Sequence, residues 1–171
     1  MQQATIPTDE AVRLAALQAT ELLDTASEPR FDRLTHLVQQ CLGAEIVLIS
    51  LIYSERQWFK SHQGLEVCET GRDISFCGHA ILDSGILEVS DTRADQRFAD
   101  NPLVTGAPFI RFYAGAPLRI NDLDIAAGMH RFLTDEAADA TDCGGADLSG
   151  LADAVGVVAH LVVELLAQLH Q

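Results

Sequence analysis

Hydrophobic and polar positions divide the chain into stretches of helical and of strand-like spacing. Between residues 8 and 43, apolar residues recur every three to four positions in two runs, which predicts two helices. Thr8 is placed to cap the first helix, and Gly43 stands where the second helix should end. Residues 44–53, AEIVLISLIY, are apolar on both alternating faces and rich in β-branched side chains, which predicts a central strand covered on both sides.

The segment that follows predicts short strands joined by loops. Ser54 and Glu55 mark a turn, after which RQWFKSHQG resumes the alternation of a hairpin partner. Asn-Pro, Gly and Pro after residue 92 allow at most one brief helix, around residues 95–100. We therefore predict the sheet and its loops within residues 44–135, with further strands at 86–91, 110–120 and 125–135, a short helix at 75–84 and a loop at 64–73.

A long helix is predicted from residue 147 to residue 171. Its apolar residues follow a regular three-four spacing, and leucines beside this seam add more apolar surface than one neighbouring helix can cover. We therefore expect the seam to form a homodimer contact rather than only to pack on the sheet. The seam consists of Leu151, Val155, Val158, Val162, Leu165 and Leu169.

The order of the predicted elements is typical of an α+β fold in a single domain, residues 1–171. Two helices, a set of mostly antiparallel strands and a closing helix place the helices on one face of the sheet. Loops within residues 64–110 then cover the other face. A sheet face roofed by loops is a concave site for a small molecule, so the order of elements already predicts a binding pocket.

The charge of the chain narrows the classes of partner. It contains 11 Lys and Arg against 25 Asp and Glu, a formal net charge of -14. Such a surface repels a phosphate backbone and the anionic face of a membrane, so we expect neither nucleic acid nor membrane as a partner. No signal peptide or bilayer-spanning apolar stretch is visible, and the four cysteines lack the spacing of a disulfide framework, which favours a cytoplasmic protein with reduced thiols.

Cys77 and His79, in the segment DISFCGHAIL, are the residues most suggestive of chemistry. If Ser75 caps a helix, Cys77 lies in its first turn, where free N–H groups stabilise a thiolate. The two side chains would point about 200° apart around that helix, so a Cys–His dyad is not expected. No metal-ligand spacing recurs, and the two residues are either plain core or the wall of a pocket.

Two arginines and several aromatic residues lie on strands and loops that should surround the pocket. Arg111 and Arg131 fall on predicted strands, where a guanidinium must find a carboxylate or an anionic ligand. For Arg111 the alternative is a pair with Asp91 or Asp100 that ties a loop to the sheet. The aromatic candidates form either core or a stacking wall; they are Trp58, Phe76, Phe98 and Tyr113.

Four blocks of the sequence resemble, in this order, the bacterial GAF domains of sensor histidine kinases and diguanylate cyclases. They are RQWFKSHQGL (56–65), ISFCGHAI (74–81), EVSDTRADQRFADNPLVTG (88–106) and IRFYAGAPL (110–118). The resemblance implies a six-stranded antiparallel sheet, with N- and C-terminal helices on one face and a loop-roofed pocket on the other. It implies a sensory or regulatory role and no catalytic residue. The residues that it brings to the pocket and its roof are Phe76, Cys77, His79, Asp91, Arg97, Phe98, Asn101, Arg111, Phe112 and Tyr113.

The last predicted strand departs from the family pattern, because His130 and Arg131 stand where the family has apolar residues. Both are therefore candidate ligand contacts, and both could instead fill the pocket. Since no output domain follows the last predicted helix, we expect a stand-alone module that binds a small molecule, forms a helical homodimer and signals to a separate output protein. The ligand and any cofactor are unknown at this stage.

Two other functions stay open. Free methionine-(R)-sulfoxide reductases resemble this fold and place a cysteine in a segment comparable to that of Cys77, with Cys68 as the nearest candidate for a resolving thiol. A ligandless dimerisation scaffold would fill its pocket with its own side chains. No dinucleotide-binding, P-loop, zinc-protease or serine-hydrolase motif is present, so an enzyme is not the expected reading. The signature of cyclic-nucleotide-binding members is missing too, which disfavours that ligand.

Overall fold

The computed structural model describes residues 1–120 and 123–133. The helix predicted from residue 147 lies outside these residues. So do the six residues of the predicted dimer seam, Leu151, Val155, Val158, Val162, Leu165 and Leu169.

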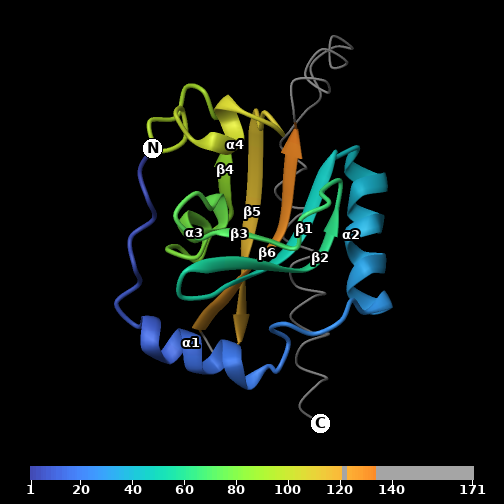
Figure 1. The fold of residues 1–171 in the computed structure, drawn as a ribbon, viewed down its shortest axis with the longest axis vertical. Coiled ribbons are helices and arrows are strands. Elements are labelled where there is room, and N and C mark those ends of the chain that lie inside the picture. The colour runs from blue at the N-terminus through green and yellow to red at the C-terminus, as the bar shows by residue number, and fades with distance from the viewer. Residues whose placement is uncertain (121–122, 134–171) are drawn as a thin grey trace.

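A six-stranded antiparallel sheet forms the centre of the described residues (Figure 1). The strand order is β3-β2-β1-β6-β5-β4. This arrangement confirms the predicted α+β fold and its mostly antiparallel pairing. The strands are β1 (Ile46–Ile52), β2 (Arg56–Gln63), β3 (Glu69–Gly71), β4 (Leu87–Val89), β5 (Phe112–Ile120) and β6 (Leu123–Leu133).

The two N-terminal helices are α1 (Glu10–Ala19) and α2 (Pro29–Leu42). Thr8 does not cap α1, because that helix begins after Asp9, whose side chain makes no capping hydrogen bond. Gly43 ends α2 as predicted, with a φ of 58° that favours glycine.

One face of the sheet packs against these helices. Side chains alternate across β1, so that Val47, Ile49 and Leu51 join the core with Leu17 of α1 and Phe31 of α2. All five residues are buried. β1 is therefore the central, doubly covered strand that its composition predicts.

Short, irregular elements roof the other face (Figure 1). They are α3 (Phe76–Ala80), α4 (Pro102–Thr105) and the loops around them. Ser75 caps α3 as predicted, since its hydroxyl accepts the Gly78 N–H at 3.0 Å. The predicted brief helix at 95–100 was misplaced: Asn101 caps a helix that starts at Pro102, and its side chain accepts the Leu103 N–H at 2.9 Å.

β3 lies within the segment that was predicted to be only a loop. It is three residues long, and it pairs with residues 56–58 of β2. Three residues are too few to show a strand alternation, so the sequence pattern missed it. No helix among the described residues is long and apolar enough to cross a membrane.

A buried ionic cluster ties α1 to the sheet. The Arg13 guanidinium donates to Glu10 at 2.8 Å and to the Ile52 carbonyl at 2.7 Å. Arg72, directly after β3, donates to Glu10 and to the Tyr53 carbonyl at 3.0 Å. Partial burial alone would raise the pKa of Glu10, but hydrogen bonds from both arginines outweigh it and lower this pKa to about 2.

Candidate functional site

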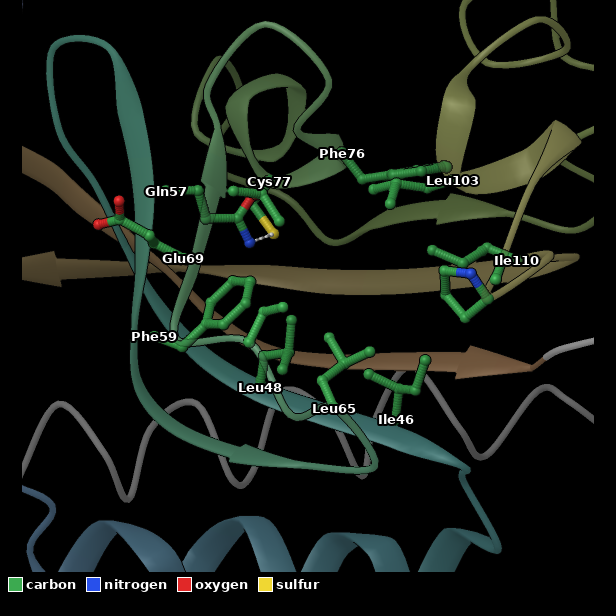
Figure 2. Close-up of a pocket in the computed structure, with 14 residues that line it drawn as sticks. Ile46, Leu48, Gln57, Phe59, Leu65, Glu69, Phe76, Cys77, Leu103 and Ile110 are labelled. Atoms are coloured by element: carbon green, nitrogen blue, oxygen red, sulfur yellow. Dashed lines mark hydrogen bonds between the residues drawn. The ribbon is translucent and has the colours of Figure 1, made fainter.

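A cavity of about 380 Å³ lies between the roofed face of the sheet and the loops above it (Figure 2). Its walls are mostly aliphatic and aromatic, and they come from β1, β2, β3, α3 and the segments around residues 65 and 103–110. The size and the apolar walls are typical of small-molecule pockets. The lining residues are Ile46, Leu48, Gln57, Phe59, Leu65, Val67, Glu69, Thr70, Phe76, Cys77, Leu103, Ala107, Pro108 and Ile110.

Polar and apolar side chains occupy opposite ends of this cavity. Figure 2 shows Gln57, Cys77 and Glu69 at one end and Leu103 and Ile110 at the other. The polar end is held by a chain of hydrogen bonds. The Gln57 side-chain amide donates to the Cys77 Sγ at 3.0 Å, and its carbonyl oxygen accepts from the Ser75 hydroxyl. Because Ser75 also caps α3, one set of bonds fixes the helix, Gln57 and Cys77 together.

Cys77 is a neutral thiol in this environment. Burial raises its pKa to about 11, although hydrogen bonds with Ser50, Tyr113, Gln57 and Ser75 act in the opposite direction. Its place in the first turn of α3 was expected to stabilise a thiolate. That expectation is wrong, because removing the sulfur from water costs more than the five-residue helix returns.

His79 points away from Cys77 toward the N-terminal segment. Its Nε2–H donates to the carbonyl oxygen of Gln2 at 3.0 Å, and its ring meets the ring of Phe98 edge-on at 4.9 Å. Burial lowers the pKa of this histidine. His79 therefore fixes the N-terminal segment to the roof and does not line the cavity.

Of the predicted aromatic wall, only Phe76 contacts the cavity. Phe98 stacks beneath it at 4.2 Å between ring centroids, and Tyr113 lies at 5.2 Å from it. Both supporting rings are almost completely buried. Burial raises the pKa of Tyr113, and neighbouring Cys77 adds to the effect. Phe98 and Tyr113 thus hold Phe76 in place without lining the cavity.

The charged residues predicted for the pocket stabilise its loops instead. Asp91 accepts from Arg93 at 3.0 Å, and Arg97 donates to Asp95 at 2.6 Å. These hydrogen bonds lower the pKa of both carboxyl groups. Arg111, just before β5, donates to the carbonyl oxygens of Val104 and Ile110 at 2.9 and 3.1 Å. These bonds tie the loop to the sheet, and the charge of Arg111 also helps to lower the pKa of Asp91, one of the two partners that the alternative reading expects.

Trp58 was assigned to the wrong face of the sheet. It belongs to the core on the helix side, while its neighbours Gln57 and Phe59 line the cavity. For His130 and Arg131 the backbone register alone is described. His130 pairs with Leu48, a cavity residue, and Arg131 pairs with Val47, a residue of the helix-side core. The predictions about their side chains lie outside what the structure describes.

A second hollow, of about 600 Å³, lies along β2 near the start of α2. Its walls carry the chain's only lysine, Lys60, whose Nζ is bonded to Thr25 Oγ1 at 2.6 Å and to Glu28 at 2.6 Å. Ser61 donates to Asp32 at 2.6 Å in the same region. Many polar groups of this hollow already bond to neighbouring residues, so it is the weaker candidate for a ligand site.

Sequence reasoning overlooked most of the cavity wall. Strand alternation along β2 could have identified Gln57 and Phe59, because it places them together on the face opposite Trp58. Nothing in the sequence marks Leu65, Leu103 or Ile110 as inward-facing, since each lies in a loop or in the four-residue helix α4, which is too short to show a periodic pattern. No group of three or more His, Cys, Asp or Glu side chains able to hold a metal ion occurs in the part of the chain described.

Comparisons with known proteins show which family this chain resembles. The GAF domain family matches residues 27–126. The cyclic di-GMP phosphodiesterase PA2567 of Pseudomonas aeruginosa is 43% identical over 112 residues, which cover 66% of this chain and 19% of that protein. The chain thus spans about a fifth of the length of this relative.

Two solved structures show the same fold at low sequence identity. The GAF domain of an Acinetobacter phosphoenolpyruvate-protein phosphotransferase has a TM-score of 0.62 and 14% identity, covering 93% of this chain and 95% of that one. Free methionine-R-sulfoxide reductase from Neisseria meningitidis, in complex with its substrate, has a TM-score of 0.61 and 15% identity, covering 100% and 98%. With the family match over more than half of its length, the chain belongs to the GAF domain family.

Proposed function

We propose that this GAF domain is a regulatory module that binds a small molecule in the 380 Å³ cavity. The observation that carries the proposal is an apolar hollow whose floor is rigid sheet and whose roof is short segments. Apolar walls that lack neighbours gain dispersion contacts when a guest fills the space. A roof of short segments can adjust to that guest more easily than the packed sheet below it.

A contact route leads from the cavity to α1. Glu69 and Thr70 of β3 line the cavity, and Arg72 follows β3 directly. Arg72 donates to Glu10 of α1 at 2.5 Å, and Glu10 also bonds Arg13. Movement of the β3 wall on ligand entry would therefore pull on the first turn of α1. A ligand that prefers one position of this wall shifts the position of the helix.

We infer that the regulatory signal leaves through a homodimer built on the predicted C-terminal seam, toward an output partner in the cytoplasm. The double substitution Val158→Glu with Leu165→Glu places two charges in this seam, where they could not be buried unpaired, so the dimer should dissociate. Sedimentation velocity measures the result, and an unchanged dimer would rule out the seam. The substitution of two exposed residues on described elements, Gln40→Glu with Glu88→Gln, serves as the control.

Native mass spectrometry of freshly purified protein tests the proposed binding function. A retained small molecule, lost on denaturation, is the expected result, and it should be absent from a Leu48→Glu variant whose cavity floor carries a charge. An empty cavity in every preparation, together with no ligand in a thermal-shift screen of metabolites, would contradict the function and support a ligandless scaffold.

The similarity to the Neisseria meningitidis enzyme supports the reductase alternative only at the level of the fold. Cys77 is buried and has a pKa of about 11, whereas a thiol reductase needs an attacking thiolate. A dithiothreitol-dependent turnover assay with free methionine sulfoxide should therefore give no activity above that of a Cys77→Ser variant.

A further inference from the structure

We propose that the cavity selects an uncharged, mainly hydrocarbon ligand that carries one hydrogen-bonding head group, and that it rejects anions. This inference rests on the proposed binding function and adds the chemical class of the ligand. It is argued from the charges, the hydrogen bonds and the volume of the described wall.

The described residues of the wall offer no cation to an anionic guest. Among the fourteen described lining residues the single charged group is the Glu69 carboxylate, and its partner Arg56 donates to it at 2.7 Å. The two described arginines that the sequence placed at the pocket bond elsewhere: Arg111 donates to loop carbonyl oxygens, and Arg97 pairs with Asp95. A carboxylate or phosphate in the cavity would lose its hydration without a countercharge and would face Glu69, which makes its entry unfavourable.

The polar end offers hydrogen bonds suited to a neutral head group. The amide nitrogen of Gln57 carries two hydrogens, and Cys77 accepts one of them. The second is available to a carbonyl or hydroxyl oxygen of a guest. Thr70 lines the same cavity and adds a hydroxyl that can donate or accept. Since the hydrogen bonds with Ser75 and Cys77 hold Gln57, the head group meets a preformed donor.

The rest of the cavity suits a hydrocarbon body. Phe59 and Phe76 form aromatic walls, and the end farthest from Gln57 is built from Leu103 and Ile110 (Figure 2). Its volume of about 380 Å³ equals the liquid volume of roughly a dozen water molecules, which corresponds to a guest of about a dozen non-hydrogen atoms. A molecule of the size of a phenylalkyl amide matches this description.

A matched series of probes tests the inference on the full chain. Phenylbutanamide, phenylbutanoate and phenylbutylamine share one hydrocarbon body and differ in the charge of the head group, and cyclic di-GMP serves as a large anionic probe. Isothermal titration calorimetry at neutral pH should show the amide binding at least about tenfold more tightly than the carboxylate. Its heat-capacity change should be negative, as burial of apolar surface requires.

Two variants on the same roof helix locate the site. Leu103→Glu places a charge in the apolar end and should abolish binding of the amide. Thr105→Glu adds the same charge to an exposed residue of α4 that does not line the cavity, so it should bind as the unaltered protein does. Circular dichroism of both variants establishes that they are folded.

The possible outcomes separate the ligand class from the proposed function. Tighter binding of the carboxylate, or binding of cyclic di-GMP that the amide displaces, overturns the ligand class and leaves small-molecule binding intact. If no probe binds while native mass spectrometry finds a retained molecule, the class again falls alone. If no probe binds and no molecule is retained, both proposals fail.

Discussion

Two hollows flank β2, and they differ in whether the side chains of their walls already have bonding partners. The apolar cavity on the roofed face is lined by side chains such as Leu48, Phe59 and Ile110, which have no neighbour where the space is empty. The hollow beside α2 is lined by Lys60, Ser61 and other polar groups that already bond to nearby atoms. A guest restores lost contacts in the first hollow, whereas it must compete with existing bonds in the second.

The alternation of β2 sorts residues between these hollows. Gln57 faces the apolar cavity, and Trp58 and Lys60 face the helix side. The helix-side face is covered by regular helices whose stripe of apolar residues fills its core. The roof is held instead by bonds from side chains to the backbone, such as that from Asn101 to the Ile74 carbonyl at 2.9 Å. A roof fixed by polar bonds can span a space that it does not fill.

Among the substitutions proposed here, replacement of Gly64, beside the apolar cavity, should lower the free energy of unfolding the most. Gly64 directly follows β2, where the loop that walls the cavity begins, and it has a φ of +76°. A methyl group there would overlap the backbone carbonyl of Glu45, which cannot yield as a flexible side chain can. Gly64→Ala should therefore lower the free energy of unfolding by about 3 kcal/mol. Urea denaturation measures the loss.

Two other glycines supply controls for this prediction. Gly43→Ala meets open space but has a φ of +58°, so it should cost only about 1 kcal/mol. Gly85→Ala meets open space without that backbone strain and should change the free energy of unfolding by less than about 0.5 kcal/mol. Equal effects of the three substitutions would show that the contact with Glu45 has no role.

The acid stability of the protein should depend on Glu10, which connects the cavity wall to α1. Its pKa is lowered from 4.5 to about 2 in the folded protein, so its contribution is complete above about pH 4.5. This contribution is lost as the pH falls from about 4.5 toward 2. Glu10→Gln should cost about 2 kcal/mol at neutral pH, because the buried Arg13 loses its countercharge.

Denaturation curves at several pH values test the Glu10 prediction. The unfolding free energies of the unaltered protein and of Glu10→Gln should converge as the pH falls from about 4.5 toward 2, since protonation then removes the Glu10 carboxylate of the unaltered protein. Asp9→Asn alters the neighbouring residue outside α1 and should leave the curve unchanged. A constant difference down to pH 2 would assign the effect to packing.

Lys60→Met tests whether the polar hollow contributes to stability without affecting the apolar cavity. The substitution keeps the length of the side chain and removes the bonds to Thr25, Ala26 and Glu28, so a loss of about 1 kcal/mol is expected. The affinity for phenylbutanamide should stay the same, because Lys60 does not line the apolar cavity. Arg33→Met, on an exposed part of α2, is the control for stability. A changed affinity would mean that the two hollows are coupled.

The smallest expected effect concerns thiol labelling. Among the described residues, Cys41 and Cys68 are exposed and Cys77 is buried, so in the folded protein iodoacetamide at neutral pH should modify Cys41 and Cys68 but not Cys77. Labelling of Cys77 should rise only as the pH approaches 11, where its thiolate forms. Mass spectrometry of peptides follows each site, and denatured protein supplies full labelling. Rapid reaction of Cys77 at neutral pH would contradict this prediction and support the reductase alternative.

The sequence predicted the regular elements better than the site. The three-four spacing located α2 and its end at Gly43, and the dense β-branched run located β1. Trp58 was assigned to the pocket because aromatic side chains suit a stacking wall, yet its strand position places it on the other face. Arg111 was expected to meet an acidic group or a ligand; it donates to carbonyl oxygens of the nearby loop, and its charge also helps to lower the pKa of Asp91.

What the sequence by itself determined is the fold class and the doubly covered central strand, because hydrophobic spacing and local caps depend on residues close together along the chain. The family was indicated separately, by the resemblance of four ordered sequence blocks to GAF domains. Only the tertiary structure decided which side chains enclose the cavity. Leu65, Leu103 and Ile110 come from two loops and the short helix α4, and their inward positions depend on bonds such as that from Thr92 to the Ile110 carbonyl at 2.6 Å. The tertiary structure also decided that Cys77 is a neutral wall residue and not a thiolate. Its pKa is raised by burial, and burial depends on the whole surrounding fold.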